Sequence, residues 1–323
     1  MSLEKNKEAK SEAPFFRTGY STAGMAWYVL GTLAILAELY SYFYDPHYIL
    51  RWGGYVVFGL LLEMLYTLFS TGRPGFRSGS SAVTAAILVM SIPANMPAKA
   101  VLFAITAAVV LVRMPSVKSG IPFNPVLIGR LFLMIAFFSP IVNWSLPGID
   151  TDAVTTATPI DLYHSEDFTY SLKSLLSGHI GGSWEDMYTL VPGGPGEVFT
   201  PVIILLGLLL FWRGIVAWRT GVAFVAGFAL TCALLREPVA FNVFSGAVIF
   251  AAVFIAGDPK STPLNKGAQL AGGIIAGIAD ALIRKYTYYS EGIVYSFLLL
   301  NLLTPTLDRI AFRLRSYRLA HLK

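Results

Sequence analysis

The sequence predicts an all-α polytopic membrane protein with ten transmembrane helices, arranged as two inverted five-helix repeats with short or broken third and eighth helices. The first observation is composition: 55% of the 323 residues are hydrophobic and 13% are charged, whereas a soluble domain carries about 25% charged residues. The second is that apolar segments recur from residue 25 to residue 311, which leaves no separate soluble domain of useful size. The third is a weak repeat between the two halves of the chain.

The elements follow in order from the N-terminus. Residues 1–24 begin with a polar run and lack the apolar core and cleavage site of a signal peptide, so we expect a cytoplasmic tail. A simple spanning helix needs about 20 apolar residues; the shorter apolar segments are therefore expected to be tilted, broken or shielded by neighbouring helices. The ten segments lie at roughly 25–43, 55–70, 80–92, 98–112, 124–139, 198–212, 220–235, 243–257, 267–283 and 292–311.

The positions of Lys and Arg predict the orientation in the membrane. If the N-terminus lies inside and all ten segments cross, 17 of the 24 Lys and Arg residues fall inside, 6 fall outside, and Arg130 lies within a span. The loop 140–197 is then outside, where it carries eight acidic residues and one lysine. Residues 312–323 form a basic cytoplasmic tail.

Residues 81–97 and 245–263 share a weak repeat: a small-residue start, a short apolar run and then Pro-x-x-x-Pro. Each run overlaps the third apolar segment of a block of five; the two blocks are residues 25–139 and 198–311. Because five is odd, the second block is inverted relative to the first. Paired short segments in inverted halves predict a central ligand site lined by half-helices. The alternative explanation is close packing of helices rich in Gly, Ala and Ser.

Several classes of site are disfavoured by composition. The single cysteine, Cys232, cannot build a disulfide, an iron–sulfur cluster or a cysteine-based zinc site within this chain. His164 and His179 share the acidic loop with Glu166 and Asp167, but their spacing matches no metal-ligand pattern. The net charge of +5 does not indicate nucleic-acid binding, because the basic residues are dispersed in short loops.

Charged residues within the predicted spans include three acids, Glu38, Glu63 and Asp280, and the basic residue Arg130. Charges at membrane depth are costly, and acidic residues there mark ion or proton routes. We therefore predict that the three acids belong to an ion path. Ion pairing within the helix bundle is the alternative explanation.

Three motifs carry a resemblance to a known family. GIPFNPVLIGRLFLMIAFF (120–138), FIAGDPKSTPLNKG (254–267) and YSEGIVYSFLLLNLLTPTLD (289–308) resemble the D subunit of Rnf-type ferredoxin:NAD oxidoreductases and the B subunit of the sodium-pumping NADH:quinone reductase. The resemblance covers about residues 13–311, and chain length favours the Rnf subunit. It implies the inverted-repeat fold shared with urea channels, and an electron-transfer subunit of an ion-translocating complex that is not catalytic alone.

The resemblance also implies a covalent cofactor in the outer loop. In this family the loop carries an Asp followed by Ser-Gly-Ala-Thr, and the Thr hydroxyl forms a phosphoester with FMN. The matching residues here run from Asp152 through Ala157 to Thr158, so the modified position is Thr158. Thr155 and Thr156 replace the Ser and Gly of the family, and they are alternative acceptors. Because a hydroxyl is a weak nucleophile, a separate flavin transferase is expected to attach the FMN.

A second, non-covalent flavin, riboflavin in the homologous subunits, is implied near Asn124 and Arg130. Asn124 before Pro125 is also a good helix N-cap, and both roles are compatible. The implied partners are the other membrane and peripheral subunits of the Rnf complex. They include a second covalent-FMN subunit, iron–sulfur subunits and a NAD-binding subunit, in a bacterial or archaeal cytoplasmic membrane with its lipid.

The fold alone would also support a small-solute channel or transporter. Such a channel needs neither an acidic outer loop nor a Thr at position 158. The B subunit of the quinone reductase is the other alternative. The sequence is compatible with either Na⁺ or H⁺ as the transported ion, and with either direction of electron flow.

Overall fold

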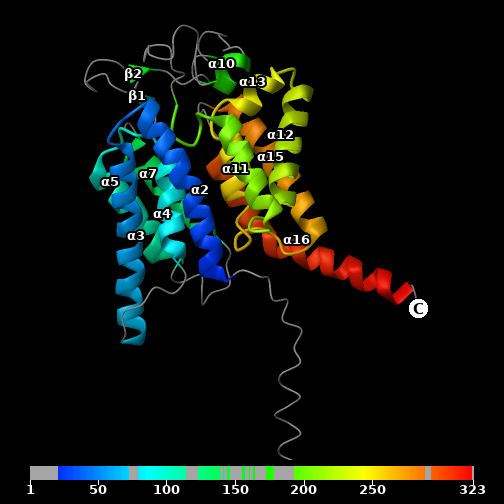
Figure 1. Cartoon of the computed structure of the whole chain (residues 1–323). Coiled ribbons are helices and arrows are strands. Elements are labelled where there is room, and N and C mark those ends of the chain that lie inside the picture. Colours follow the sequence, from blue (N-terminus) through cyan, green and yellow to red (C-terminus); the bar gives the residue numbers. More distant parts are fainter. Residues whose placement is uncertain are drawn as a thin grey trace, which may run out of the picture.

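The computed structural model describes residues 21–72, 79–113, 123–138, 193–287 and 292–321, together with short pieces of the loop between them at 141, 144–145, 155–156, 160, 163 and 172–177. These residues form an all-helical bundle with one pair of two-residue strands (Figure 1). By length and composition, four of the described helices can each cross a membrane: α2 (Thr22–Phe43), α3 (Tyr48–Thr71), α15 (Lys266–Tyr286) and α16 (Ile293–His321).

The remaining elements are shorter. In the first half they are α4 (Ser80–Met90), α5 (Ala98–Thr106), which continues as the π-helix η1 (Ala107–Arg113), and α7 (Pro125–Ala136). In the second half they are α11 (Thr200–Trp212), α12 (Trp218–Leu234), α13 (Val239–Phe244), and α14 (Val248–Phe250), which continues as η3 (Ala251–Ile255). The loop contributes β1 (Trp144–Ser145), β2 (Thr155–Thr156) and α10 (Leu172–Ser177).

The third segment of each half is short or broken, as its sequence suggests. α4 has 11 residues, about 16 Å of helix, whereas the hydrocarbon core is about 30 Å thick. In the second half the helix is interrupted at Ser245 and Gly246, between α13 and α14. Gly246 has a φ of 67°, a left-handed conformation that glycine adopts without steric cost.

Both ends of α4 find partners within the protein. Helix ends leave four N–H and four C=O groups unpaired. At the N-terminal end, Glu63 of α3 accepts a hydrogen bond from the Ser81 N–H at 3.2 Å. At the C-terminal end, the Gly196 N–H donates to the Met90 carbonyl at 2.9 Å. The Tyr48 hydroxyl makes a longer bond, 3.5 Å, to the Val89 carbonyl.

The described loop pieces lie at one end of the bundle. Figure 1 shows β1, β2 and α10 at one end of the bundle, opposite the end where α2 begins and the C-terminal part of α16 leaves the bundle. Tyr163 and Leu175 pack with Phe241 and Phe244 of α13, and the Tyr163 hydroxyl donates to the Glu237 carboxylate. This part of the loop is therefore anchored to the second half of the bundle.

Glycines bring α12 and α15 into close contact. A Cβ atom built on Gly277 would lie 2.2 Å from the Phe224 carbonyl oxygen, and one on Gly273 would lie 2.5 Å from the Thr220 carbonyl oxygen. Both distances are far shorter than van der Waals contact. Small residues allow helix backbones to approach in this way, and dispersion then stabilises the pair.

We expect Gly277→Ala to destabilise the protein, because the new methyl group forces α12 and α15 apart. Overpacking of this kind costs about 1–3 kcal/mol. The measurement is the thermal unfolding of the detergent-solubilised protein. The matched control is Gly54→Ala in α3, where an added Cβ meets nothing within 4 Å. An unchanged melting temperature for Gly277→Ala would contradict the close packing.

Candidate functional site

A buried hydrogen-bond network joins the two halves of the bundle. The backbone N–H of Asn124 donates to Oδ1 of Asn301 at 2.8 Å, and Nδ2 of Asn301 donates to the Ser261 carbonyl at 2.8 Å. Nδ2 of Asn124 also donates to Oγ of Ser261 at 3.2 Å. All three side chains are buried. The network connects the start of α7, the segment after η3, and α16.

Local sequence fixes both sides of this network. Asn124 has an extended backbone and caps α7, since its Oδ1 accepts from the Val126 N–H at 3.0 Å. Asp258 organises the opposite turn: its Oδ1 accepts from the Lys260 N–H at 3.1 Å, and its Oδ2 accepts from the Ser261 hydroxyl at 3.0 Å. Asp is favoured in turns because its side chain bonds the backbone two residues onward.

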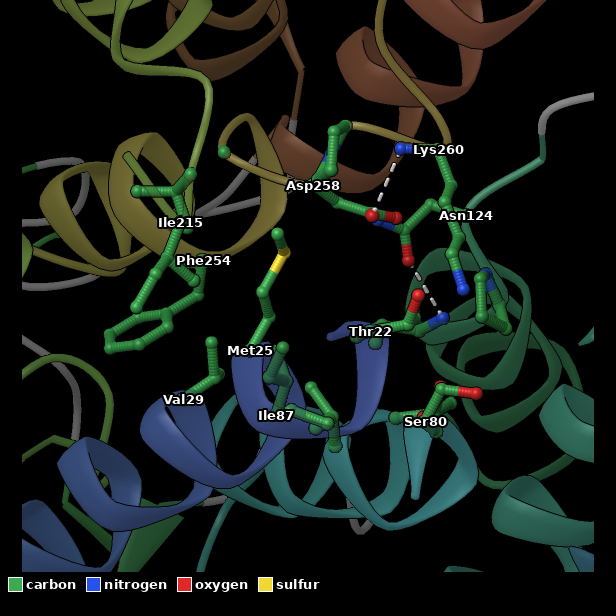
Figure 2. A pocket seen from close by; sticks show the side chains of 18 residues that line it. Thr22, Met25, Val29, Ser80, Ile87, Asn124, Ile215, Phe254, Asp258 and Lys260 are labelled. Carbon is green, nitrogen blue, oxygen red and sulfur yellow. Dashed lines mark hydrogen bonds between the residues drawn. The ribbon is translucent and has the colours of Figure 1, made fainter. Parts of the chain in front are cut away.

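Beside this network lies a pocket of about 130 Å³ that is open on one side. Figure 2 shows apolar side chains on one flank, with polar side chains opposite them. Its apolar walls include Met25, Val29, Ile87, Ile215 and Phe254, and its polar side includes Thr22, Ser80, Asn124, Asp258 and Lys260.

Three helices begin at this pocket. Thr22, Ser80 and Pro125 are the first residues of α2, α4 and α7, and all three line the pocket. The N-terminal end of a helix carries a partial positive charge and unpaired N–H groups. The Ser81 and Val126 N–H groups are already bonded within the protein. The pocket therefore offers apolar surface and the positive ends of three helices, with the Asp258 carboxylate among its lining residues. This combination suits a molecule with an apolar body and polar groups on one side.

The structure separates the predicted site residues. Asn124 lines the pocket. Arg130 lies further along α7 and is buried, but it is not part of the pocket lining. Among the three acids, Glu38 is exposed on α2, Glu63 bonds the start of α4, and Asp280 is fully buried in α15. They lie on three different helices.

Asp280 has a buried cation one helical turn away. Nη1 of Arg284 donates to the Asn242 carbonyl at 2.9 Å, and its guanidinium lies over the Phe228 ring, 5.0 Å from the centroid. Asn242 belongs to the last turn of α13, whose carbonyls have no partner within the helix. Arg284 thus supplies a hydrogen bond at the point where the helix is broken.

Sequence reasoning missed Ser261, Asn301 and Arg284. Asn301 carried a usable signal, because it is a lone amide within the apolar run FLLLNLL, and polar groups in a span usually find a partner there. Ser261 lies inside the repeated Pro-x-x-x-Pro stretch. Arg284 stands at the end of a span, where a basic residue usually reflects topology.

The predicted covalent site falls outside the described residues. Asp152, Ala157 and Thr158 have no described structure. Thr155 and Thr156, which lie between Asp152 and Ala157, form β2, and β2 pairs antiparallel with Trp144–Ser145. β-Branched residues favour such extended backbone, so Thr at the family's Gly position is compatible with this conformation. Within the described part of the chain, no group of three His, Cys, Asp or Glu residues is placed to hold a metal ion.

Comparisons with known proteins agree with the sequence motifs. A family model described as the NQR2, RnfD, RnfE family matches residues 9–315. The D subunit of the proton-translocating ferredoxin:NAD(+) oxidoreductase complex of Clostridium ljungdahlii is 26% identical over 322 residues, which cover 95% of each chain. The D subunit of the Na(+)-translocating ferredoxin:NAD(+) oxidoreductase complex of Acetobacterium woodii is 30% identical over 231 residues, 71% of this chain and 70% of the relative. The D subunit of the ion-translocating oxidoreductase complex of Mannheimia succiniciproducens is 29% identical, covering 93% of this chain and 95% of the relative.

Proposed function

Because the chain belongs to the NQR2, RnfD, RnfE family, we propose that it is the flavin-bearing D subunit of an ion-translocating ferredoxin:NAD oxidoreductase complex. The observation that carries this proposal is the pocket. There the Asn-Pro signature of one half and the Asp-Pro signature of the other meet through direct hydrogen bonds. The other membrane and peripheral subunits, including the iron–sulfur, NAD-binding and second FMN-bearing subunits, supply the remaining steps of the reaction.

The architecture is two inverted repeats of five helices, residues 25–139 and 198–311. Equivalent contacts support this. The first helix packs on the third segment in each half, α2 on α4 and α11 on α14 and η3. The fifth packs on the fourth, α7 on η1 and α16 on α15. The halves also meet through equivalent helices, α2 with α11 and α7 with α16, as a pseudo-two-fold axis requires.

Both termini lie in the cytoplasm, so that the pocket opens inward and the loop 140–197 faces outward. The excess of Lys and Arg on the inner side supports this orientation.

We expect a single Cys at position 165, replacing Ser165 in a Cys232→Ala background, to react with an impermeant thiol reagent in intact cells. The reagent cannot cross the membrane, so it reaches only residues on the outer face. Labelling that appears only after lysis would contradict this orientation.

The pocket takes the non-covalent flavin. Met25, Val29 and Phe254 offer apolar surface to the ring, while Asn124 and the N-terminal ends of α2, α4 and α7 provide polar groups for its edge. Any part of the flavin that does not fit into the enclosed volume extends through the open side of the pocket. A bound flavin exchanges one or two electrons and thereby connects one-electron carriers to a hydride acceptor. The positive helix ends favour added electron density at this position.

We expect Val29→Phe to fill the pocket and to lower the amount of flavin that denaturation releases into the supernatant. FMN retained on the denatured chain should not change. The control is Val57→Phe on the exposed face of α3, which should leave the released flavin at its normal level. Wild-type release from Val29→Phe would place the second flavin elsewhere.

The covalent FMN is carried by Thr158, attached through its hydroxyl by a flavin transferase. The order of residues supports this choice over Thr155 and Thr156, because Thr158 stands where the family motif has its Thr, directly after Ala157.

We expect Thr158→Ala to abolish in-gel flavin fluorescence after denaturation, while the folded protein is retained because only one loop hydroxyl is lost. Protein from a host with the transferase is required. Thr155→Ala and Thr156→Ala are the matched controls and should keep the fluorescence. Mass spectrometry that places FMN on Thr155 or Thr156 would refute the assignment, and a chain without flavin would favour the channel function.

Of the three acids assigned to an ion path, Glu63 and Asp280 are inside the bundle. Asp280 is one turn from Arg284, which bonds the Asn242 carbonyl of the broken helix, and broken helices line ion sites. The relatives from C. ljungdahlii and A. woodii are named for protons and Na⁺ respectively, so either ion is compatible with the family.

We expect Asp280→Asn in the assembled complex to lower ion uptake into inverted vesicles more than electron transfer from ferredoxin to NAD, because the amide keeps the shape but removes the charge. Glu63→Gln is the comparison, since its carboxylate bonds the start of α4 and its loss should reduce both activities together. A wild-type ratio of ions to electrons in Asp280→Asn would remove Asp280 from the path.

A further inference from the structure

One face of α2 is uncovered along its length. Trp27, Gly31, Ile35, Glu38 and Tyr42 recur every three or four residues, so they lie on the same side of the helix. We name these five residues the Glu38 face. All five are exposed, with 62% of Trp27, 50% of Ile35 and 80% of Tyr42 accessible. Figure 1 shows α2 at the near side of the bundle, between the first-half helices and α11.

Glu38 lies at membrane depth on this face. It is five residues before Phe43, the last residue of α2, which is about 7 Å along the helix axis from that end. Its short stem does not give it the reach by which Lys and Arg at helix ends extend to the membrane surface. An acidic group facing lipid costs about 2.5–3.5 kcal/mol or more. Within the described residues Glu38 makes no hydrogen bond or ion pair.

The other exposed faces differ. On α3 the exposed positions Val57, Leu61 and Leu65 are all apolar, as expected for contact with lipid. Glu63, on the same helix, turns inward and accepts a backbone hydrogen bond. The exposed apolar positions of α3 therefore contrast with the Glu38 face, which carries a carboxylate among its exposed residues.

We infer that the Glu38 face is covered by a transmembrane helix of another subunit of the complex, which presents Arg, Lys or another hydrogen-bond donor to Glu38. This inference rests on the proposed function, because it requires a membrane partner. Charge complementarity defines the partner, since an acidic group at this depth needs a donor. Gly31 permits close approach: a Cβ built there meets nothing within 4 Å, and small residues mark helix–helix contacts in membranes.

A second copy of this chain does not fit. A symmetric contact through this face would bring Glu38 toward its own equivalent, and like charges repel. Arg213 and Arg51 lie near α2, but each is already bonded: the Arg213 guanidinium donates to the Tyr28 hydroxyl at 3.2 Å, and Arg51 pairs with Asp45. Tyr28 is ten residues before Glu38, about 15 Å along the helix. Since no donor reaches Glu38 from the part of the chain that the structure describes, we assign the donor to a different chain.

The first test is photo-crosslinking in the intact complex. A photoreactive amino acid at Ile35 should crosslink this chain to a membrane-spanning subunit, identified by mass spectrometry. The same amino acid at Leu61 of α3 is the control and should give no crosslinked protein. Crosslinks from Ile35 to lipid alone, to a soluble subunit, or to a second copy of this chain would each overturn the inference.

The second test changes the charge. Glu38→Leu should lower recovery of membrane partners with the tagged chain by about tenfold or more, because the partner's donor is left unpaired. Glu38→Gln should lose less, since its amide oxygen still accepts a hydrogen bond, and Glu38→Lys should lose most. The melting temperature of the isolated chain should not fall with Glu38→Leu or Glu38→Gln, because Glu38 has no partner among the residues that the structure describes. Wild-type recovery with Glu38→Leu would overturn the inference.

These outcomes separate the inference from the proposed function. If the wild-type chain co-purifies with redox subunits but Ile35 gives no crosslink to a membrane subunit, the inference fails and the proposed function stands. If the wild-type chain co-purifies with no redox subunit, both fail.

Discussion

A helix that ends inside a membrane leaves backbone N–H and C=O groups that lipid cannot satisfy. This constraint governs the structure, because α4 is too short to cross and α13 is broken from α14. Glu63 and Gly196 satisfy the two ends of α4, and Arg284 satisfies a carbonyl at the end of α13. Glu63 comes from α3, Gly196 from the segment before α11, and Arg284 from α15. The hydrogen bonds at the ends of the short helices therefore fix the positions of the long helices relative to them.

The same constraint explains where the pocket lies. The polar groups freed at the start of α7 are met by the turn after η3 and by Asn301 of α16, which fixes both halves at one level. The pocket beside these contacts is lined by the positive N-terminal ends of α2, α4 and α7, and residues further along these helices form part of its apolar wall. The pocket therefore lies at the end of the bundle where α2, α4 and α7 begin, and the contacts between the two halves hold its lining residues together.

The sequence predicted the parts of this arrangement that depend on local chemistry. Asn124 before Pro125 defines an N-cap, and the apolar run before Ser91 and Pro93 is too short for a full span. Hydropathy does not predict which face of a helix a residue occupies. α2, α3 and α15 are all apolar enough to span and each carries one acid, yet only the acids of α3 and α15 are buried. Asn301 and Ser261 were missed because their roles depend on contacts between segments distant in the chain.

The three acids differ in how the cost of placing a negative charge at membrane depth is offset. Glu63 accepts an N–H at a helix start, where the dipole favours negative charge. Asp280 is fully buried one turn from the Arg284 guanidinium, so a counter-charge lies on its own helix. Glu38 faces outward from α2, and the cost of its charge is not offset within the described part of the chain. A subunit that satisfies the ends of its short helices internally, yet keeps one carboxylate on a lipid-level face, has an incomplete surface. The interaction between a partner helix and Glu38 then governs both the stability of this subunit in the membrane and its place in a larger assembly.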